Sequence, residues 1–189
     1  MRIIGGKFRS RQVRTLSGMK LRPTSDRLRE TLFNVLTAGN PAALEGSVWL
    51  DLFAGSGAVG IEALSRGASL VYFIESHRPA VNVIRENLRS LGIEEAAFQI
   101  LEREAEQALR QLDSTGVVCD CCFLDPPYKM EAAYQHSLGL LSQSRLLGRK
   151  SVVIAEHDRR YDPGEHFNAL QRYRKLEQGD SALSFYRLA

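Results

Sequence analysis

The sequence predicts an α/β fold with a mostly parallel sheet, helices on both faces of the sheet and an antiparallel strand at one edge. Three observations predict it. From residue 47 onward, short apolar runs alternate with segments of helical character, as in parallel sheets whose strands are joined by helices. The first run leads into a Gly-rich turn, and three runs end in an acid: Asp51, Glu75 and Asp125. Two final strand-like stretches around residues 179–180 are typical of a hairpin.

The composition indicates one globular domain with a small appendage. The chain has 189 residues, of which 44% are hydrophobic, so it can bury a core without disulfide bonds. It has no apolar run of about 18 residues, and its basic start, MRIIGGKFRS, lacks the apolar centre of a signal peptide. We therefore expect a cytoplasmic protein with no membrane partner.

The first 40 residues are predicted to form an extension made of a hairpin and a helix. Strand-like pieces near the start predict the hairpin over residues 2–16. Residues 22–36 carry apolar side chains at helical spacing behind the capping candidates Thr24, Ser25 and Asp26. The main domain is then residues 41–189.

The main domain repeats a strand–helix unit. Strands are predicted over residues 47–53, 69–75, 96–101, 117–124 and 151–157, and the closing hairpin over 173–188. Helices are predicted over residues 58–67, 79–91, 104–112 and 131–147. Ligands on such sheets bind outside the carboxyl ends of the strands, so the loops after the strand-ending acids are the candidate site.

The turn DLFAGSGAVG has the glycine spacing of a loop that lets the backbone pass close to a ligand at a helix N-terminus. Glu75 ends the next strand, where a carboxylate can grip ribose hydroxyls. This arrangement fits NAD or any other adenosine cofactor, and the alternative is a tight turn beside a core strand. The candidate cofactor-binding residues are Asp51, Phe53, Ala54, Gly55, Ser56, Gly57, Glu75 and Ser76.

Asp51 favours S-adenosylmethionine among these cofactors. A carboxylate just before the loop would repel a pyrophosphate, whereas S-adenosylmethionine has no phosphate and carries an ammonium and a sulfonium. Asp51 can hold the ammonium, or it can cap N–H groups of the loop, and the two roles can coexist.

The stretch LDPPY ends the fourth predicted strand and has the chemistry to hold a nucleobase amine. The carboxylate of Asp125 and the carbonyl of Pro126 can accept the two amine N–H groups. The rings of Pro126 and Pro127 fix the backbone direction, and Tyr128 can stack on the base. The alternative is a Pro-rich turn with a buried Tyr. We expect Asp125, Pro126, Pro127 and Tyr128 to be the catalytic residues.

The net charge of +3 is unevenly distributed. Residues 1–30 hold nine Lys or Arg and two acids, and the rest of the chain has a net charge of −4. A basic segment that also carries apolar residues indicates a polyanionic partner, although a solubilising tail is the alternative. The candidate residues for binding a nucleic acid are Arg2, Lys7, Arg9, Arg11, Arg22 and Arg27. Arg22, Thr24, Asp26 and Arg29 either reach the active-site mouth or cap and solvate a helix.

The three cysteines, Cys119, Cys121 and Cys122, are predicted to be buried strand thiols. Their C-x-C-C spacing is not a zinc pattern and no His lies near in sequence, so we expect no metal.

The motifs DLFAGSGAVG, FIES and LDPPY together resemble S-adenosylmethionine-dependent amino-group methyltransferases. RIIGGKFRSRQV followed by LRPTSDRLRETLFNVL closely resembles the RsmD family, and the likeness covers nearly the whole chain. It implies a Rossmann-like class I fold with a seven-stranded sheet, and transfer of methyl to a guanine N2 of bacterial 16S ribosomal RNA. It further implies an assembled or assembling small subunit as the substrate, and we expect a monomer.

The same resemblance implies a contact to the adenine of the cofactor after the third strand. The matching side chain is Glu104, which is longer than the Asp or Asn of similar proteins.

Three other functions stay open at this point. The glycine pattern also fits a nicotinamide-dependent oxidoreductase, although Asp51 and DPPY do not favour it. DPPY serves an adenine-N6 methyltransferase on RNA or DNA equally well. The third is an RNA-binding assembly factor without catalysis, which an intact cofactor loop and DPPY disfavour.

Overall fold

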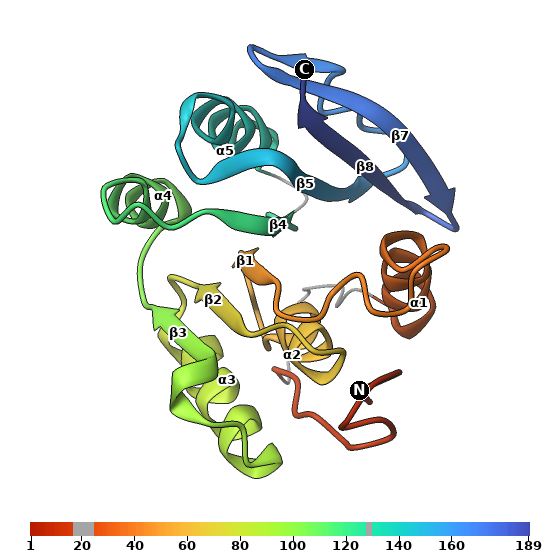
Figure 1. Cartoon of the computed structure of the whole chain (residues 1–189), viewed down its shortest axis with the longest axis vertical. Coiled ribbons are helices and arrows are strands. Elements are labelled where there is room, and N and C mark those ends of the chain that lie inside the picture. Colours follow the sequence, from red (N-terminus) through yellow and green to blue (C-terminus); the bar gives the residue numbers. More distant parts are fainter. Residues whose placement is uncertain (17–24, 128–129) are drawn as a thin grey trace.

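The computed structural model describes residues 1–16, 25–127 and 130–189, and its centre is one sheet. The strands are β1 (Val48–Leu52), β2 (Leu70–Ile74), β3 (Phe98–Leu101), β4 (Cys119–Leu124), β5 (Leu147–Asp158), β6 (His166–Phe167), β7 (Leu170–Gln178) and β8 (Ser181–Leu188). They form an eight-stranded sheet in the order β3-β2-β1-β4-β5-β8-β7-β6 (Figure 1). The strands from β3 to β5 are parallel, and β8, β7 and β6 continue the sheet in antiparallel pairing.

Helices cover both faces of this sheet. They are α1 (Asp26–Leu36), α2 (Ala58–Ser65), α3 (Arg78–Leu91), α4 (Ala105–Asp113) and α5 (Glu131–Gln143), and a short 3₁₀ turn spans Glu95–Ala97. The first three pack on one face and the last two on the other, so the molecule has two apolar cores (Figure 1). This is the arrangement expected when parallel strands are joined by right-handed helical connections. No helix within the described ranges is long and apolar enough to cross a membrane.

The predicted α/β architecture is confirmed, with three differences. The sheet has one strand more than the predicted seven, the two-residue β6. β5 begins at Leu147 instead of residue 151, because α5 ends at Gln143 and Leu147 pairs with Cys119 before the register shifts. Within residues 1–16 the predicted hairpin is reduced to a loop closed by one antiparallel bridge, Arg2 to Gln12. The Ser25 cap of α1 is confirmed, since its side chain accepts the Leu28 N–H at 3.1 Å.

A buried carboxylate fastens the N-terminal loop to α2. Glu62 is fully buried, and its two oxygens accept the N–H groups of Ile4 and Gly5, each at 2.8 Å. Arg66 donates to the same carboxylate at 2.8 Å, and the guanidinium of Arg29, only 1% exposed, lies 3.7 Å from it. Four partners thus compensate the cost of burying this charge.

The apolar side chains of the N-terminal segment join the core of the main domain. Ile3 and Val13 are buried in the same cluster as Trp49 of β1, and Phe33 of α1 stacks on Trp49 with ring centroids 5.5 Å apart. The described part of residues 1–40 therefore packs on the sheet instead of forming a core of its own.

Replacing Glu62 tests this attachment. We expect Glu62→Ala to lower the free energy of unfolding by roughly 3–5 kcal/mol, because Arg29 would lose its buried counter-charge and two backbone N–H groups would lose their acceptor. Urea unfolding measures the loss, and hydrogen exchange at Ile4 and Gly5 should accelerate. The matched control is Glu106→Ala, which removes an exposed ion pair with Arg110 and should cost less than about 1 kcal/mol. Equal losses in the two variants would contradict the attachment.

Candidate active site

Two of the predicted loops lie side by side at one edge of the sheet. β1 and β4 are neighbours with Leu52 opposite Leu124, so Asp51 and Asp125 both stand at the carboxyl ends of adjacent parallel strands. The N–H of Asp125 points to the carbonyl of Leu52, with the nitrogen 3.4 Å from the oxygen. The Gly-rich loop after β1 and the Pro-rich turn after β4 therefore open onto the same place.

Asp51 is buried beneath the Gly-rich loop. The residue is 2% exposed, and its Oδ2 accepts the N–H of Gly60 in α2 at 2.9 Å. Burial raises the pKa of Asp51 to about 8, the hydrogen bond from Gly60 opposes the rise, and the charge of Glu75 adds to it. Asp51 therefore does cap a helix N–H, and a cation bound beside it would stabilise its ionised form.

The loop backbone adopts the left-handed conformation at three positions, two of which are glycines. Phe53, Gly55 and Gly57 all have positive φ, at 63°, 56° and 78°. Glu75 braces the loop, since one carboxylate oxygen accepts the Gly55 N–H and the other the His77 N–H, each at 2.8 Å. A carboxylate has lone pairs beyond these two bonds and can still accept from hydroxyls.

Glycines in this segment leave space on one side and allow close packing on the other. A Cβ built on Gly55 would meet nothing within 4 Å, so open space lies above the loop. A Cβ on Gly60 would come within 2.4 Å of the ring of Phe73 on β2, which α2 must approach closely to dock on the sheet. The first glycine thus leaves room for a ligand and the second positions the helix.

The turn after β4 carries an acid in an unfavourable electrostatic environment. Asp125 is partly exposed as a residue, Pro126 is buried and Pro127 is exposed. Desolvation raises the pKa of Asp125 well above its usual range, and the charges of Glu156 and Asp51 raise it further. Three acids thus converge at the ends of β1, β4 and β5.

Glu156 is a site residue that the sequence analysis did not single out. It lies near the end of β5, where Leu124 pairs with Ala155, so Asp125 and Glu156 follow that pair on neighbouring strands. It is 1% exposed, and its carbonyl accepts the hydroxyl of Tyr134 at 2.7 Å. The signal was present, because the run SVVIAEH carries an acid one residue before its end, close to where the other three runs place theirs.

The other predicted cofactor residues lie around this edge. Ala54 donates its N–H to the Ile74 carbonyl at 3.0 Å, and Ser56 accepts from Asn87 at 3.0 Å, so β2 and α3 brace the loop. Ser76 is exposed after β2. Glu104 is exposed at the N-cap of α4, where its side chain makes no capping bond, so it is available to a ligand.

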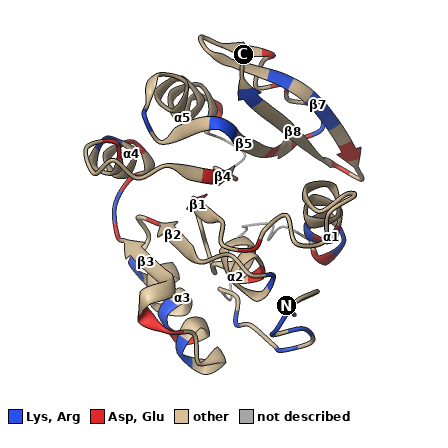
Figure 2. Cartoon of the chain, viewed as in Figure 1, with Lys and Arg blue, Asp and Glu red and all other residues tan. Residues whose placement is uncertain are grey.

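The predicted RNA-binding side chains on described residues are exposed, and they follow the N-terminal loop and α1 (Figure 2). These are Arg2, Lys7, Arg9, Arg11 and Arg27. Arg29 does not reach a site mouth, because it is buried between Glu62 and Asp26. The predictions for Tyr128, Arg22 and Thr24 concern positions outside the described residues.

The cysteines pack in the sheet as predicted. Burial raises the pKa of Cys119 and of Cys121 to about 12, and that of Cys122 well above its usual range, so all three are thiols at neutral pH. Among the described residues, no group of three or more His, Cys, Asp or Glu side chains has the arrangement to hold a metal ion.

Comparison with known proteins yields one family over almost the whole length. The family model described as "Conserved hypothetical protein 95" matches residues 1–187. The proteins named ribosomal RNA small subunit methyltransferase D in Haemophilus influenzae and Escherichia coli are each 35% identical to the chain. The first match covers 84% of this chain and 79% of the relative, and the second 84% and 75%. The solved structure of Escherichia coli yhhF superposes with a TM-score of 0.81 at 30% identity, covering 100% of this chain and 97% of the other.

Asp51→Asn tests the buried charge. A pKa raised on folding means that the folded state holds the proton more tightly, so Asp51 makes the wild type lose stability as the pH rises from about 4 to 8. The amide can still accept from Gly60 and does not titrate. We expect the unfolding free energy of the variant, relative to that of the wild type, to rise by several kcal/mol as the pH increases across this window. Unfolding free energies at a series of pH values measure this difference. Glu30→Gln, an exposed acid on α1, is the control. Parallel pH profiles for wild type and Asp51→Asn would contradict the buried charge.

Proposed function

The chain belongs to the family described as conserved hypothetical protein 95, the RsmD family, and on this premise we propose that it transfers a methyl group to the exocyclic N2 amine of a guanine in 16S ribosomal RNA. The sheet is that of a Rossmann-like methyltransferase, and the cofactor is S-adenosylmethionine. The observation that carries the proposal is the adjacency of the Gly-rich loop and the Asp125–Pro126 turn on neighbouring strands.

The residues at the end of β1 and β2 fit this cofactor. Asp51 is a buried carboxylate whose Oδ2 already holds the Gly60 N–H, so its remaining acceptor capacity suits an ammonium group. Glu75 would take ribose hydroxyls, and the space above Gly55 would admit the ligand to the loop. Glu104 at the start of α4 is the proposed contact to the adenine. When bound, the cofactor supplies an electrophilic methyl group.

The turn after β4 would prepare the amine. The lone pair of a nucleobase amine is delocalised into the ring, which makes the amine a poor nucleophile. Two acceptors placed on its N–H groups, the Asp125 carboxylate and the Pro126 carbonyl, would favour the pyramidal amine whose lone pair can attack. Pro126 and Pro127 hold these acceptors in place because each ring fixes its own φ. Positioning of this kind can lower the activation free energy by about 7–11 kcal/mol in favourable cases.

The N-terminal residues would bring the RNA to this edge. We propose residues 1–40 as an RNA-binding extension of a methyltransferase domain formed by residues 41–189. The support is the row of exposed Arg and Lys side chains along the N-terminal loop and α1. The proposed substrate is the RNA of the assembled or assembling small subunit in the cytoplasm, and the proposed enzyme is a monomer.

Methyl transfer to small subunits that lack the modification is the direct experiment. Purified protein is incubated with labelled S-adenosylmethionine and these subunits, and the RNA is digested to nucleosides. Label in N2-methylguanosine is the expected result. Label in N6-methyladenosine would keep the chemistry and overturn the base assignment. Absence of label from a folded protein that binds the cofactor would contradict the proposal.

Variants of Asp125 separate its acceptor role from its charge. We expect Asp125→Ala to lower kcat by roughly 100-fold or more with S-adenosylmethionine affinity nearly unchanged, because the transition state loses an acceptor on the amine. The conservative Asp125→Asn keeps a neutral acceptor and should retain more activity. In the wild type, kcat should rise with pH through the raised pKa of Asp125, since the ionised carboxylate is a stronger acceptor for the amine than the neutral carboxyl.

The amide of Asp125→Asn does not titrate, so the acid limb of the pH profile should flatten in that variant. An alanine variant within threefold of wild type, or an unchanged acid limb in the asparagine variant, would contradict the role of Asp125.

A further inference from the structure

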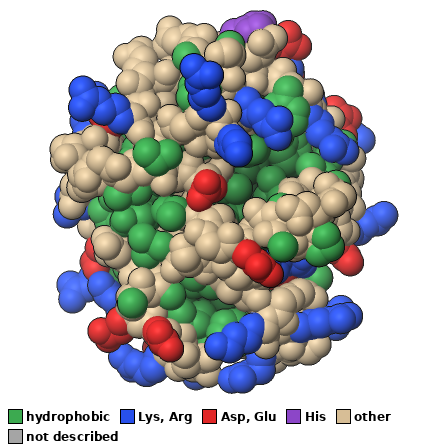
Figure 3. Space-filling model, viewed as in Figure 1, with side chains coloured by type: hydrophobic (Ala, Val, Ile, Leu, Met, Phe, Trp, Pro, Cys, Tyr) green, Lys and Arg blue, Asp and Glu red, His purple; other side chains and the backbone are tan. Residues whose placement is uncertain are grey.

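A second basic surface lies at the opposite edge of the sheet from the candidate active site. We call it the β5–β7–β8 patch and define it by four exposed residues: Lys150, Tyr173, Arg174 and Arg187. Figure 3 shows hydrophobic side chains near the middle of one face, over the region of β5, β8 and α1, with Lys and Arg side chains along their upper side. None of the three cations forms an ion pair with any acid in the described parts of the chain.

A β-bulge aims the aromatic side chain of the patch outward. The pairing of β7 with β8 shifts register between Arg172 and Arg174, which leaves Tyr173 as the extra residue. Tyr173 is 46% exposed, and no other Phe, Tyr or Trp of the described residues is exposed to this degree. The Arg187 guanidinium carbon lies 4.4 Å from the centre of its ring. The ring thus holds a guanidinium plane in a fixed orientation at the surface.

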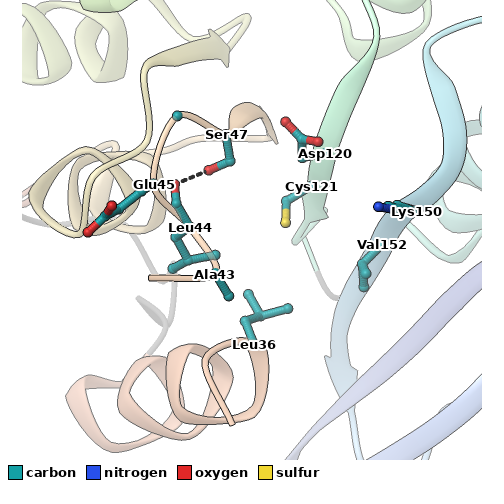
Figure 4. A pocket seen from close by; sticks show the side chains of 10 residues that line it. Leu36, Ala43, Leu44, Glu45, Ser47, Asp120, Cys121, Lys150 and Val152 are labelled. Carbon is teal, nitrogen blue, oxygen red and sulfur yellow. Dashed lines mark hydrogen bonds between the residues drawn. The ribbon is translucent and has the colours of Figure 1, made fainter. Parts of the chain in front are cut away.

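The register of the sheet brings the patch beside a cavity of about 340 Å³. In the pairing of β5 with β8, Val153 lies opposite Tyr186. The next residue on each strand is Val152 on β5 and Arg187 on β8, and Val152 lines the cavity. Lys150 also lines it, opposite Leu36 and Leu44 (Figure 4).

Two acids, Asp120 and Glu45, also line the cavity, and the Glu45 carboxylate points away from Lys150 (Figure 4). Asp120 accepts the Val48 N–H at 2.8 Å, and Glu45 packs along Gly67 beside α2. Burial raises the pKa of Tyr173, while the charges of Arg187 and Arg174 and a hydrogen bond with Arg187 lower it. The surface therefore offers positive charge outside the ion pairs of the described residues and an exposed stacking plane, beside a recess of mixed polar and apolar lining.

These are the groups that recognise single-stranded RNA. Cations that no acid neutralises attract phosphates, and an aromatic ring or a guanidinium plane stacks on any base. We propose that the β5–β7–β8 patch binds an unpaired segment of the RNA substrate, with Lys150 and Arg174 on phosphates and a base stacked on the Arg187–Tyr173 pair.

The distance to the active site defines what the patch does. Lys150 and Glu156 stand six residues apart along β5, which is about 20 Å in a strand. The patch is therefore too far from Asp125 to touch the reacting base, and it would hold a different segment of the same RNA. Its loss should raise the KM for long RNA and leave kcat unchanged. The inference rests on the proposed function for the identity of the RNA, although binding can be measured without methyl transfer.

Two variants test the patch through different interactions. The double variant Lys150→Glu with Arg174→Glu should weaken binding of fluorescein-labelled oligouridine at least tenfold. The salt slope, which is the steepness of the fall of log affinity with log salt concentration, should decrease by about 1.4 because two phosphate contacts to a single strand are lost. Tyr173→Leu should weaken the same binding at least about fivefold and leave the slope unchanged, because stacking releases no counterions. Fluorescence anisotropy at several salt concentrations measures both, and methylation of full-length 16S RNA gives KM and kcat.

The control is the double variant Arg110→Glu with Arg145→Glu, which makes the same change in net charge on the other face of the sheet. Oligouridine affinity and salt slope equal to those of this control would overturn the proposal, as would a defect only in binding ribosomal proteins. S-adenosylmethionine affinity reports folding of each variant. If the double variant fails this check, the single Tyr173→Leu variant decides. Patch-dependent RNA binding by a wild type that methylates no RNA would support the patch and refute the proposed function.

Discussion

The parallel pairing of β1 with β4 is the constraint on which the site depends. Strands that run in the same direction end at the same edge, so their following loops must share one space. Here Leu52 and Leu124 are opposite each other, and Asp125 donates its N–H toward Leu52. Had β4 run antiparallel, its Pro-rich turn would lie a full strand length from the Gly-rich loop. The cofactor residues and the amine-holding residues of the proposed reaction can therefore meet only because of this pairing.

The N-terminal segment depends on a second electrostatic arrangement, the carboxylate of Glu62. A buried charge is costly unless it is paired and hydrogen-bonded, and Glu62 gathers two backbone N–H groups and two guanidinium groups. These partners come from the N-terminal loop, α1 and α2, so one side chain ties three segments together. The exposed Arg and Lys side chains of the loop are thus carried on a rigid support. A support of this kind lets them present their charges at a defined distance from the site.

The active-site edge holds a different electrostatic arrangement, in which three acids lie at the ends of neighbouring strands. Asp51, Asp125 and Glu156 converge there. Burial and the charge of Glu75 raise the pKa of Asp51, and burial with the charges of Glu156 and Asp51 raises the pKa of Asp125. Such a cluster destabilises the fold at neutral pH, and strongly perturbed acids in a cleft are typical of functional sites. A cationic ligand and a base with N–H donors would both relieve this repulsion. The electrostatic cost in the free protein is therefore consistent with the proposed pair of ligands.

The sequence by itself determined the element types and the loops that carry chemistry. Strand and helix periodicity, the glycines after β1 and the acids that end β1, β2 and β4 are local patterns, and each residue's neighbours along the chain suffice to read them. Tertiary structure alone decided the rest. Glu156 meets Asp125, Glu62 meets Ile4, and Arg187 lies beside Val152 only through strand order, register and helix packing, which bring together residues far apart in the chain. The bulge at Tyr173 is likewise a product of β7 pairing with β8, so the basic patch it helps to form has no signature in the local sequence.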